Sequence, residues 1–172
     1  IEFPKSFRSV TAEKVRELVK ELSPEIQPVG VFVNASMELV TGLLNDGTLA
    51  AAQLHGQEDE TYIRELKQLS DKPIIKAFSV KTAEDIENAV QSPADYILLD
   101  QGSGGTGKTF DWSLIPEIEQ PFFLAGGIGA LNMKQAICEI RPYAVDLSSS
   151  VETEKWKDPK KIRQVVDIVR RI

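Results

Sequence analysis

The sequence has little of what disulfide-bonded, metal-binding and membrane proteins need. Its 172 residues include one cysteine, Cys138, and one histidine, His55. One cysteine excludes an intramolecular disulfide framework and is typical of a reducing cytoplasm. One histidine, one cysteine and scattered carboxylates make no recognisable ligand set, so we expect no metal site. No apolar run approaches the length of a membrane span. We therefore expect a cytoplasmic protein.

Basic residues are outnumbered by acidic ones. The formal net charge is −6 at pH 7, and the pI is near 4.9. This balance argues against a surface for nucleic acid or anionic membrane, since both attract basic proteins. A hydrophobic content of 42% with 27% charged residues is ordinary for a globular protein. The length predicts a single domain over residues 1–172 with a sizeable core.

Short apolar runs alternate with amphipathic stretches along the chain. The runs are rich in β-branched and aromatic residues, which predicts buried parallel strands, and no antiparallel hairpin signal is present. Thr11 and the pair Asp158-Pro159 are typical helix starts. We predict strands at residues 29–33, 50–54, 73–78, 96–99, 122–125 and 144–147. We predict helices at residues 11–22, 63–69, 86–90 and 133–140 and from residue 159.

Six βα units fit either a doubly wound sheet or a (βα)8 barrel. Polar residues gather just after the predicted strands, and barrel enzymes build their sites at that rim. The small residues at 126–127 and 148–150 resemble a phosphate clamp, which in barrels follows strands seven and eight. We therefore predict an α/β, (βα)8 TIM-barrel type fold, here as six βα units (strands 3–8) of an incomplete barrel.

Residues 102–109 fit G-x-x-x-x-G-K-[ST], the phosphate-binding loop of nucleotide hydrolases. Such a loop opens directly into a long helix, but residues 110–115 run only to Pro116. We therefore reject the nucleotide interpretation and expect the Gly-rich loop at residues 102–108 to be either a lid or a disordered segment. In this interpretation the chemical residue is Asp100, at the end of a buried strand.

Seven motifs occur in one order across the chain: FPKSFR at residues 3–8, VGVFVN at 29–34, QLHG at 53–56, LLD at 98–100, GGTGKTFDW at 104–112, LAGG at 124–127 and VDLSSSVE at 145–152. Together they resemble the phosphoribosylanthranilate isomerase family of tryptophan biosynthesis, which performs an Amadori rearrangement. The resemblance implies an N-glycoside of anthranilate carrying ribose 5-phosphate as substrate, and chemistry that needs no cofactor.

The resemblance also implies roles for individual residues. Asp100 corresponds to the acid that protonates the furanose ring oxygen. Arg8 corresponds to an arginine that binds the anthranilate carboxylate, a task suited to a planar guanidinium. His55 either lies on the substrate side or is structural, and we include it as a substrate-binding residue. The residues that correspond to the phosphate clamp are Gly126, Gly127, Ser148, Ser149 and Ser150.

The sequence departs from the family pattern at two places that matter. The family's base is a cysteine in a Lys-Ile-Cys-Gly motif on the first strand, and no such segment is present. We therefore expect the sequence to lack the first βα unit and, in this form, to be inactive. Cys138 lies in a predicted outer helix, where we expect a small core residue rather than a base. Ser150 stands where the family usually has glycine.

Two other functions stay open. One is a phosphosugar-binding fragment without catalysis, whose exposed barrel edges would form a homodimer. The other is the related histidine-pathway sugar isomerase, which performs the same rearrangement with two aspartates. The motifs at residues 53–56 and 107–112 resemble the tryptophan enzyme only, and substrate competition would separate the two isomerases.

Overall fold

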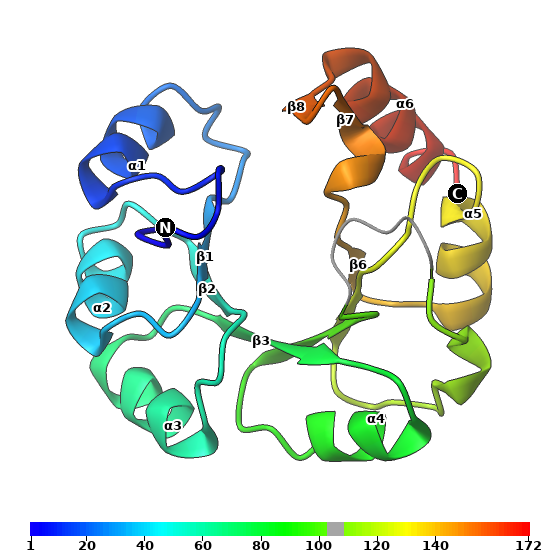
Figure 1. Cartoon of the computed structure of the whole chain (residues 1–172), viewed down its shortest axis with the longest axis horizontal. Helices are drawn as coiled ribbons and strands as arrows, with labels where there is room; N and C mark the ends of the chain where they lie inside the picture. Colours follow the sequence, from blue (N-terminus) through cyan, green and yellow to red (C-terminus); the bar gives the residue numbers. More distant parts are fainter. Residues whose placement is uncertain (103–108) are drawn as a thin grey trace. The chain divides into compact units, whose positions relative to one another are not determined.

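The computed structural model describes residues 1–102 and 109–172, in which parallel strands alternate with helices (Figure 1). The order of the strands follows the chain from β1 to β6. These strands are β1 (Val29–Phe32), β2 (Ala51–Leu54), β3 (Ile74–Ser79), β4 (Tyr96–Asp100), β5 (Phe122–Leu124) and β6 (Ala144–Val145). The strands begin and end close to their predicted positions, so the predicted α/β fold class is confirmed.

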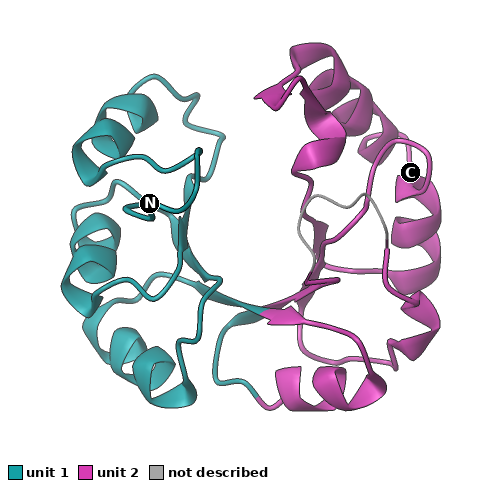
Figure 2. Ribbon diagram, in the orientation of Figure 1, with its two compact units in different colours: residues 1–77, 92–96 teal, residues 78–91, 97–172 magenta. Residues whose placement is uncertain are grey.

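The chain forms two compact units (Figure 2). Unit 1 contains residues 1–77 and 92–96, and unit 2 contains residues 78–91 and 97–172. The prediction of one domain over residues 1–172 stays a prediction.

In unit 1, β1 pairs in parallel with β2, and β2 with β3. The helices α1 (Ala12–Val19), α2 (Met37–Asn45) and α3 (Glu60–Leu69) lie on one side of these strands (Figure 1). The core between them contains fully buried side chains, each of which contributes about 1.5–3 kcal/mol. These side chains include Phe32, Leu43, Leu44, Leu54, Ile63, Leu66 and Ile74.

In unit 2, β4 pairs in parallel with β5, and β5 with β6. Its helices are α4 (Ala83–Ala89), α5 (Met133–Gln135), the π-helix η2 (Ala136–Ile140) and α6 (Pro159–Val169). Unit 2 also contains two short 3-10 helices, η1 (Trp112–Leu114) and η3 (Ser149–Val151). The core includes Ile86, Ile97, Leu99, Leu124 and Met133.

Both predicted helix starts are confirmed. The Thr11 side chain accepts a hydrogen bond from Lys14 N, and the Asp158 side chain accepts from Lys160 N ahead of Pro159. These bonds satisfy amide groups that have no partner within the first helical turn. The prediction that no long helix follows residue 109 is also confirmed, because η1 has three residues. Residues 103–108, which are all but the first residue of the predicted loop and most of the P-loop motif, lie outside the described residues.

Three expectations need correction. The sequence did not predict α2, although the Ser36 side chain caps it and Val40, Leu43 and Leu44 are buried. The absence of a hairpin was wrong: β7 (Glu152–Thr153) and β8 (Trp156–Lys157) pair in an antiparallel manner. The interpretation of Cys138 as a core residue was also wrong. Its side chain is exposed because it lies on the solvent side of η2.

Candidate active site

Asp100 and Gly126 lie against each other where β4 and β5 end. The pairing of Leu99 with Leu124 brings these two strand ends level, and Ala125 N donates to Leu99 O at 2.9 Å. Gly126 has a φ of +79°, and a Cβ atom there would lie 2.7 Å from Asp100 Oδ1 and 2.8 Å from Gln101 N. Only glycine fits this position without displacing the half-buried Asp100 carboxyl group. The structure thus brings the predicted acid together with one predicted phosphate-binding residue.

The turn that follows Gly126 is held by Asn132, which the sequence analysis did not single out. Gly127 also has a positive φ, of +68°. The Asn132 side chain accepts from Gly129 N at 2.9 Å and donates to Gly127 O at 3.1 Å. A Cβ atom on Gly129 would lie 3.1 Å from Ser150 Cβ. The glycine turn and the serine segment, both predicted to bind phosphate, are therefore neighbours.

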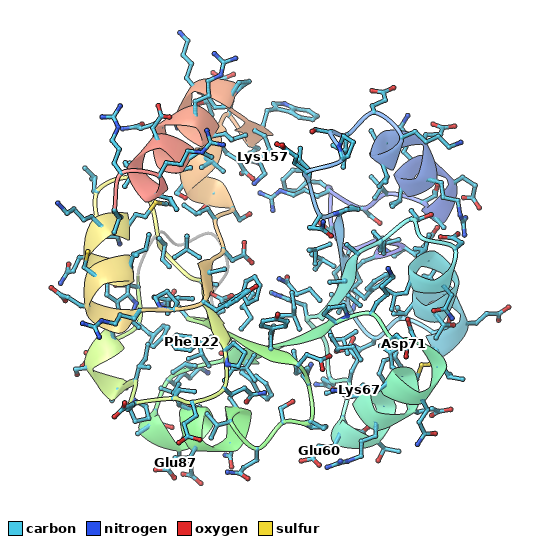
Figure 3. All side chains as sticks on the ribbon, turned by 180° about the vertical axis from the view of Figure 1, so that it is seen from behind. Glu60, Lys67, Asp71, Glu87, Phe122 and Lys157 are labelled. Atoms are coloured by element: carbon cyan, nitrogen blue, oxygen red, sulfur yellow. The ribbon has the colours of Figure 1, made fainter. Side chains whose placement is uncertain are left out.

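The serine segment presents hydroxyl groups beside a cation. Ser148 and Ser149 are exposed, whereas the Ser150 Oγ atom is buried and, among the described residues, has no hydrogen-bond partner. A buried hydroxyl group without a partner costs about 1–3 kcal/mol, which a bound oxygen could relieve. Lys157, labelled in Figure 3, donates to Ser148 O at 3.0 Å and forms an ion pair with Glu152 at 2.9 Å. This lysine therefore lies next to the segment with its charge paired with Glu152.

Arg8 and His55 lie in unit 1. The Arg8 guanidinium lies 4.6 Å above the centre of the Phe7 ring, and both side chains are exposed. The planar guanidinium suits recognition of a flat carboxylate. His55 is exposed directly after β2, and its backbone N donates to Phe32 O at 2.8 Å.

A buried ion pair adjoins His55, and the sequence analysis missed it. Glu58 and Lys76 are 7% and 6% exposed, and their charged atoms lie 3.0 Å apart. Burial alone would raise the pKa of Glu58, but hydrogen bonds from backbone amides and from Lys76 lower the pKa by more. The usable signal was a lone lysine inside the apolar run at residues 73–78, because a buried charge needs a partner.

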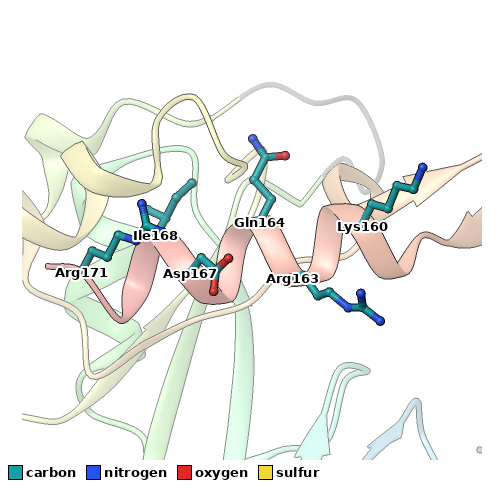
Figure 4. Close-up of a pocket in the computed structure, with 6 residues that line it drawn as sticks. All are labelled: Lys160, Arg163, Gln164, Asp167, Ile168 and Arg171. Carbon is teal, nitrogen blue, oxygen red and sulfur yellow. The ribbon is translucent and has the colours of Figure 1, made fainter.

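Two surface hollows lie elsewhere in unit 2. One, of about 470 Å³, is lined by the α6 residues Lys160, Arg163, Gln164, Asp167 and Ile168 and by Arg171, which follows the helix (Figure 4). The other, of about 540 Å³, extends from Thr109 to Ser113 and along the helix from Asn132 to Ile140. Among the described residues, neither hollow is lined by Asp100, the glycine pair or the serine segment.

Two features are absent from the described part of the chain. Within residues 1–102 and 109–172, no group of three or more His, Cys, Asp or Glu side chains is placed to hold a metal ion. None of the helices in those ranges has the length and apolar character needed to cross a membrane.

Comparison with known proteins gives one consistent result. Residues 1–168 match the family model of N-(5'-phosphoribosyl)anthranilate isomerase. An isomerase of that name from Endomicrobium trichonymphae is 45% identical over 164 residues, which cover 93% of this chain and 79% of the relative. The relative from Bacillus cereus strain ATCC 14579 is 41% identical over 172 residues, which cover 95% and 83%.

Solved structures of phosphoribosylanthranilate isomerases superpose on this fold. The Thermotoga maritima structure has a TM-score of 0.87 at 37% identity and covers 98% of this chain and 85% of its own. A structure in complex with reduced 1-(o-carboxyphenylamino)-1-deoxyribulose 5-phosphate has a TM-score of 0.81 at 32% identity, with coverage of 98% and 84%. A third, of monomers generated from the dimeric T. maritima isomerase, has a TM-score of 0.82 at 32% identity, with coverage of 99% and 84%.

Proposed function

Because the chain belongs to the N-(5'-phosphoribosyl)anthranilate isomerase family, we propose that its reaction takes place where β4 and β5 end. The protein is an isomerase of tryptophan biosynthesis that converts N-(5'-phosphoribosyl)anthranilate to 1-(o-carboxyphenylamino)-1-deoxyribulose 5-phosphate. The roles of the individual residues are the proposal. The close approach of Gly126 to the Asp100 carboxyl group carries it, since this contact brings the acid and the anion-binding turn together.

Asp100 is the general acid. Its proton goes to the ring oxygen of the ribose as the bond between that oxygen and C1′ breaks, which leaves a Schiff base between C1′ and the anthranilate nitrogen. The proton at C2′ then goes to the base, which in the family is the cysteine of the Lys-Ile-Cys-Gly motif that this sequence does not contain. The resulting enolamine tautomerises to the aminoketone. The half-buried position of Asp100 at a strand end supports this role, because a backbone held by a sheet fixes the carboxyl group.

The phosphate group binds at the glycine turn and the serine segment. Positive φ angles at Gly126 and Gly127 expose backbone that side chains would otherwise cover. The buried Ser150 hydroxyl group donates a hydrogen bond to a phosphate oxygen, which supplies the partner that it otherwise lacks among the described residues. The set that binds phosphate is Gly126, Gly127, Ser148, Ser149 and Ser150.

Arg8 and His55 bind the rest of the substrate. Arg8 pairs with the anthranilate carboxylate, whose two oxygens match the planar guanidinium in two parallel hydrogen bonds. His55 hydrogen-bonds to the substrate from the end of β2.

We also propose three broader properties. The six strands belong to a (βα)8-type barrel, because their order follows the chain and the pairings within each unit are parallel. The protein works in the cytoplasm. It forms a homodimer through a sheet edge, since β1 ends the strand order and Val29 and Val31 are 42% and 43% exposed on it. A Val31→Lys variant that leaves the sedimentation coefficient unchanged would exclude β1 from the dimer contact.

One titration tests the site as a whole. Ribose 5-phosphate added to ¹⁵N-labelled protein should shift the amide signals of Gly126, Gly127 and Ser148–Ser150 and leave those of Arg8 and His55 in place. Reduced 1-(o-carboxyphenylamino)-1-deoxyribulose 5-phosphate, the reduced product analogue, should shift both sets of amide signals, because it also carries a carboxyphenyl group. If ribose 5-phosphate leaves the glycine and serine signals unchanged, the phosphate assignment is wrong.

A further inference from the structure

The buried charges of Glu58 and Lys76 surround the backbone on both sides of His55. Lys76 Nζ donates to Gly56 O at 2.7 Å and to Leu54 O at 3.4 Å. Glu58 Oε2 accepts from Gly56 N at 2.9 Å and from Lys76 Nζ at 3.0 Å. The ion pair therefore forms hydrogen bonds with the backbone on both sides of His55, at the carbonyl of Leu54 and at the amide and carbonyl of Gly56.

The same carboxylate also holds the end of the neighbouring strand. Glu58 Oε1 accepts from Asn34 N at 2.6 Å, and Asn34 Oδ1 accepts from Gln57 N at 2.7 Å. Asn34 has a φ of +52°, an uncommon conformation for a residue other than glycine. A Cβ atom on Gly56 would overlap Asn34 Oδ1, so the two turns interlock. The turns after β1 and β2 thus depend on one pair of side chains.

Stability alone does not explain a buried pair of this kind, because apolar side chains of similar size often serve a core equally well. What the pair provides is a set of donors and acceptors that fix a turn which exposes its central side chain. We propose that Glu58 and Lys76 are positioning residues that hold His55 in the orientation in which it meets the substrate. This inference rests on the substrate-binding role proposed for His55.

The test compares Glu58→Gln and Lys76→Met with Glu60→Gln. Glu60 also forms an ion pair, with Arg64 at 3.2 Å, but the side chains of Glu60 and Arg64 are 60% and 62% exposed. His55 is the only histidine, so protein labelled with ¹⁵N-histidine reports its ring directly. The charge-preserving variant Lys76→Arg tests rescue.

We expect Glu58→Gln and Lys76→Met to shift the His55 ring signals and to weaken binding of the reduced product analogue about tenfold, since small displacements of positioned groups are costly. The affinity for ribose 5-phosphate should change less than about twofold, because this smaller ligand is expected not to contact His55. Lys76→Arg should recover most of the loss, and Glu60→Gln should show none. Unchanged His55 signals and analogue binding in folded Glu58→Gln protein would overturn the proposal.

Two further measurements keep the outcomes separate. If His55→Ala binds the analogue normally, the substrate role of His55 fails, and with it the proposal that rests on it. If the Glu58 and Lys76 variants do not fold, hydrogen exchange of the unmodified protein decides. The amides of Asn34 and Gly56 should then exchange as slowly as those within β1 and β2, and exchange at the rate of an open loop would refute the positioning role.

Discussion

Replacing Gly126 with alanine tests the contact on which the proposed site depends. The new methyl group would lie 2.7 Å from Asp100 Oδ1 and 2.8 Å from Gln101 N, both of which are closer than atoms pack. Relieving such an overlap costs about 1–3 kcal/mol. An alanine at a φ of +79° costs about 1–2 kcal/mol in addition. We expect a total loss of about 2–5 kcal/mol in the free energy of unfolding.

Gly47 provides the matched control. Its φ is +78°, yet a Cβ atom there would meet nothing within 4 Å. Gly47→Ala should therefore cost about 1–2 kcal/mol, the backbone part alone. The difference between the two variants measures the contact with Asp100 and Gln101.

Urea denaturation gives both free energies. Steady-state turnover, measured in protein supplied with a segment that bears Lys-Ile-Cys-Gly, gives the effect on the site. Gly126→Ala should lose about 100-fold in turnover, because displacing a catalytic group by about 1 Å can have that effect. Gly47→Ala should keep the activity of the unmodified protein. The reasoning is refuted if the two variants match in stability and turnover, since the carboxyl group would then not depend on the bare backbone at Gly126.

Three other predictions concern single side chains. Arg8→Ala should weaken binding of the reduced product analogue about tenfold or more, which is the loss expected for a charge-assisted hydrogen bond, and should leave binding of ribose 5-phosphate unchanged. Equal losses of affinity for the two ligands in a calorimetric titration would reject the assignment of Arg8 to the carboxylate. Ser150→Ala should raise the free energy of unfolding of the ligand-free protein by about 1 kcal/mol, because it removes a buried hydroxyl group without a partner among the described residues. The same variant should bind ribose 5-phosphate more weakly, and unchanged affinity for this ligand would contradict the proposed phosphate clamp. Glu58→Gln should lower the free energy of unfolding by about 3–5 kcal/mol at pH 7. The pKa of Glu58 in the folded protein is lowered below 4.5, so its carboxylate stabilises the protein above that pH. This contribution is lost as the pH falls through the folded pKa. Urea denaturation from pH 7 to pH 3 should therefore show the gap to the unmodified protein closing below about pH 4.5, and a constant gap would count against an ionised Glu58.

The strands and the capped helices could be predicted because each rests on a local pattern. A run such as residues 96–99 is apolar at every position, and such runs are stable only when buried. Thr11 and Asp158 mark helix starts through the chemistry of their own side chains. The polar residues that follow the strands could also be predicted as site residues. Each comes directly after a predicted strand, and the carboxyl ends of parallel strands lie at one edge of a sheet.

What could not be predicted depends on tertiary packing or on unusual backbone. The helix α2 contains Gly42 and the β-branched Val40 and Thr41, which weaken its helical signal although burial stabilises it. In the hairpin β7–β8, the turn residues Glu154 and Lys155 have φ angles of +52° and +69°, which is normally the preference of Asn-Gly. Asn132 joins Gly127 to Gly129 across a turn that has no motif of its own.

The relation between Asp100 and catalysis is the central claim, and the Asp100→Asn variant tests it directly. Turnover of N-(5'-phosphoribosyl)anthranilate is followed by the loss of anthranilate-type fluorescence in protein supplied with a segment that bears the family's Lys-Ile-Cys-Gly motif, which this sequence lacks. Binding of the reduced product analogue is titrated in the same samples. The account predicts that turnover falls by about 100-fold or more, the contribution of a general acid, while the analogue binds within about twofold of normal because the Asn side chain keeps the shape of the site. Near-normal turnover by Asp100→Asn would contradict the account.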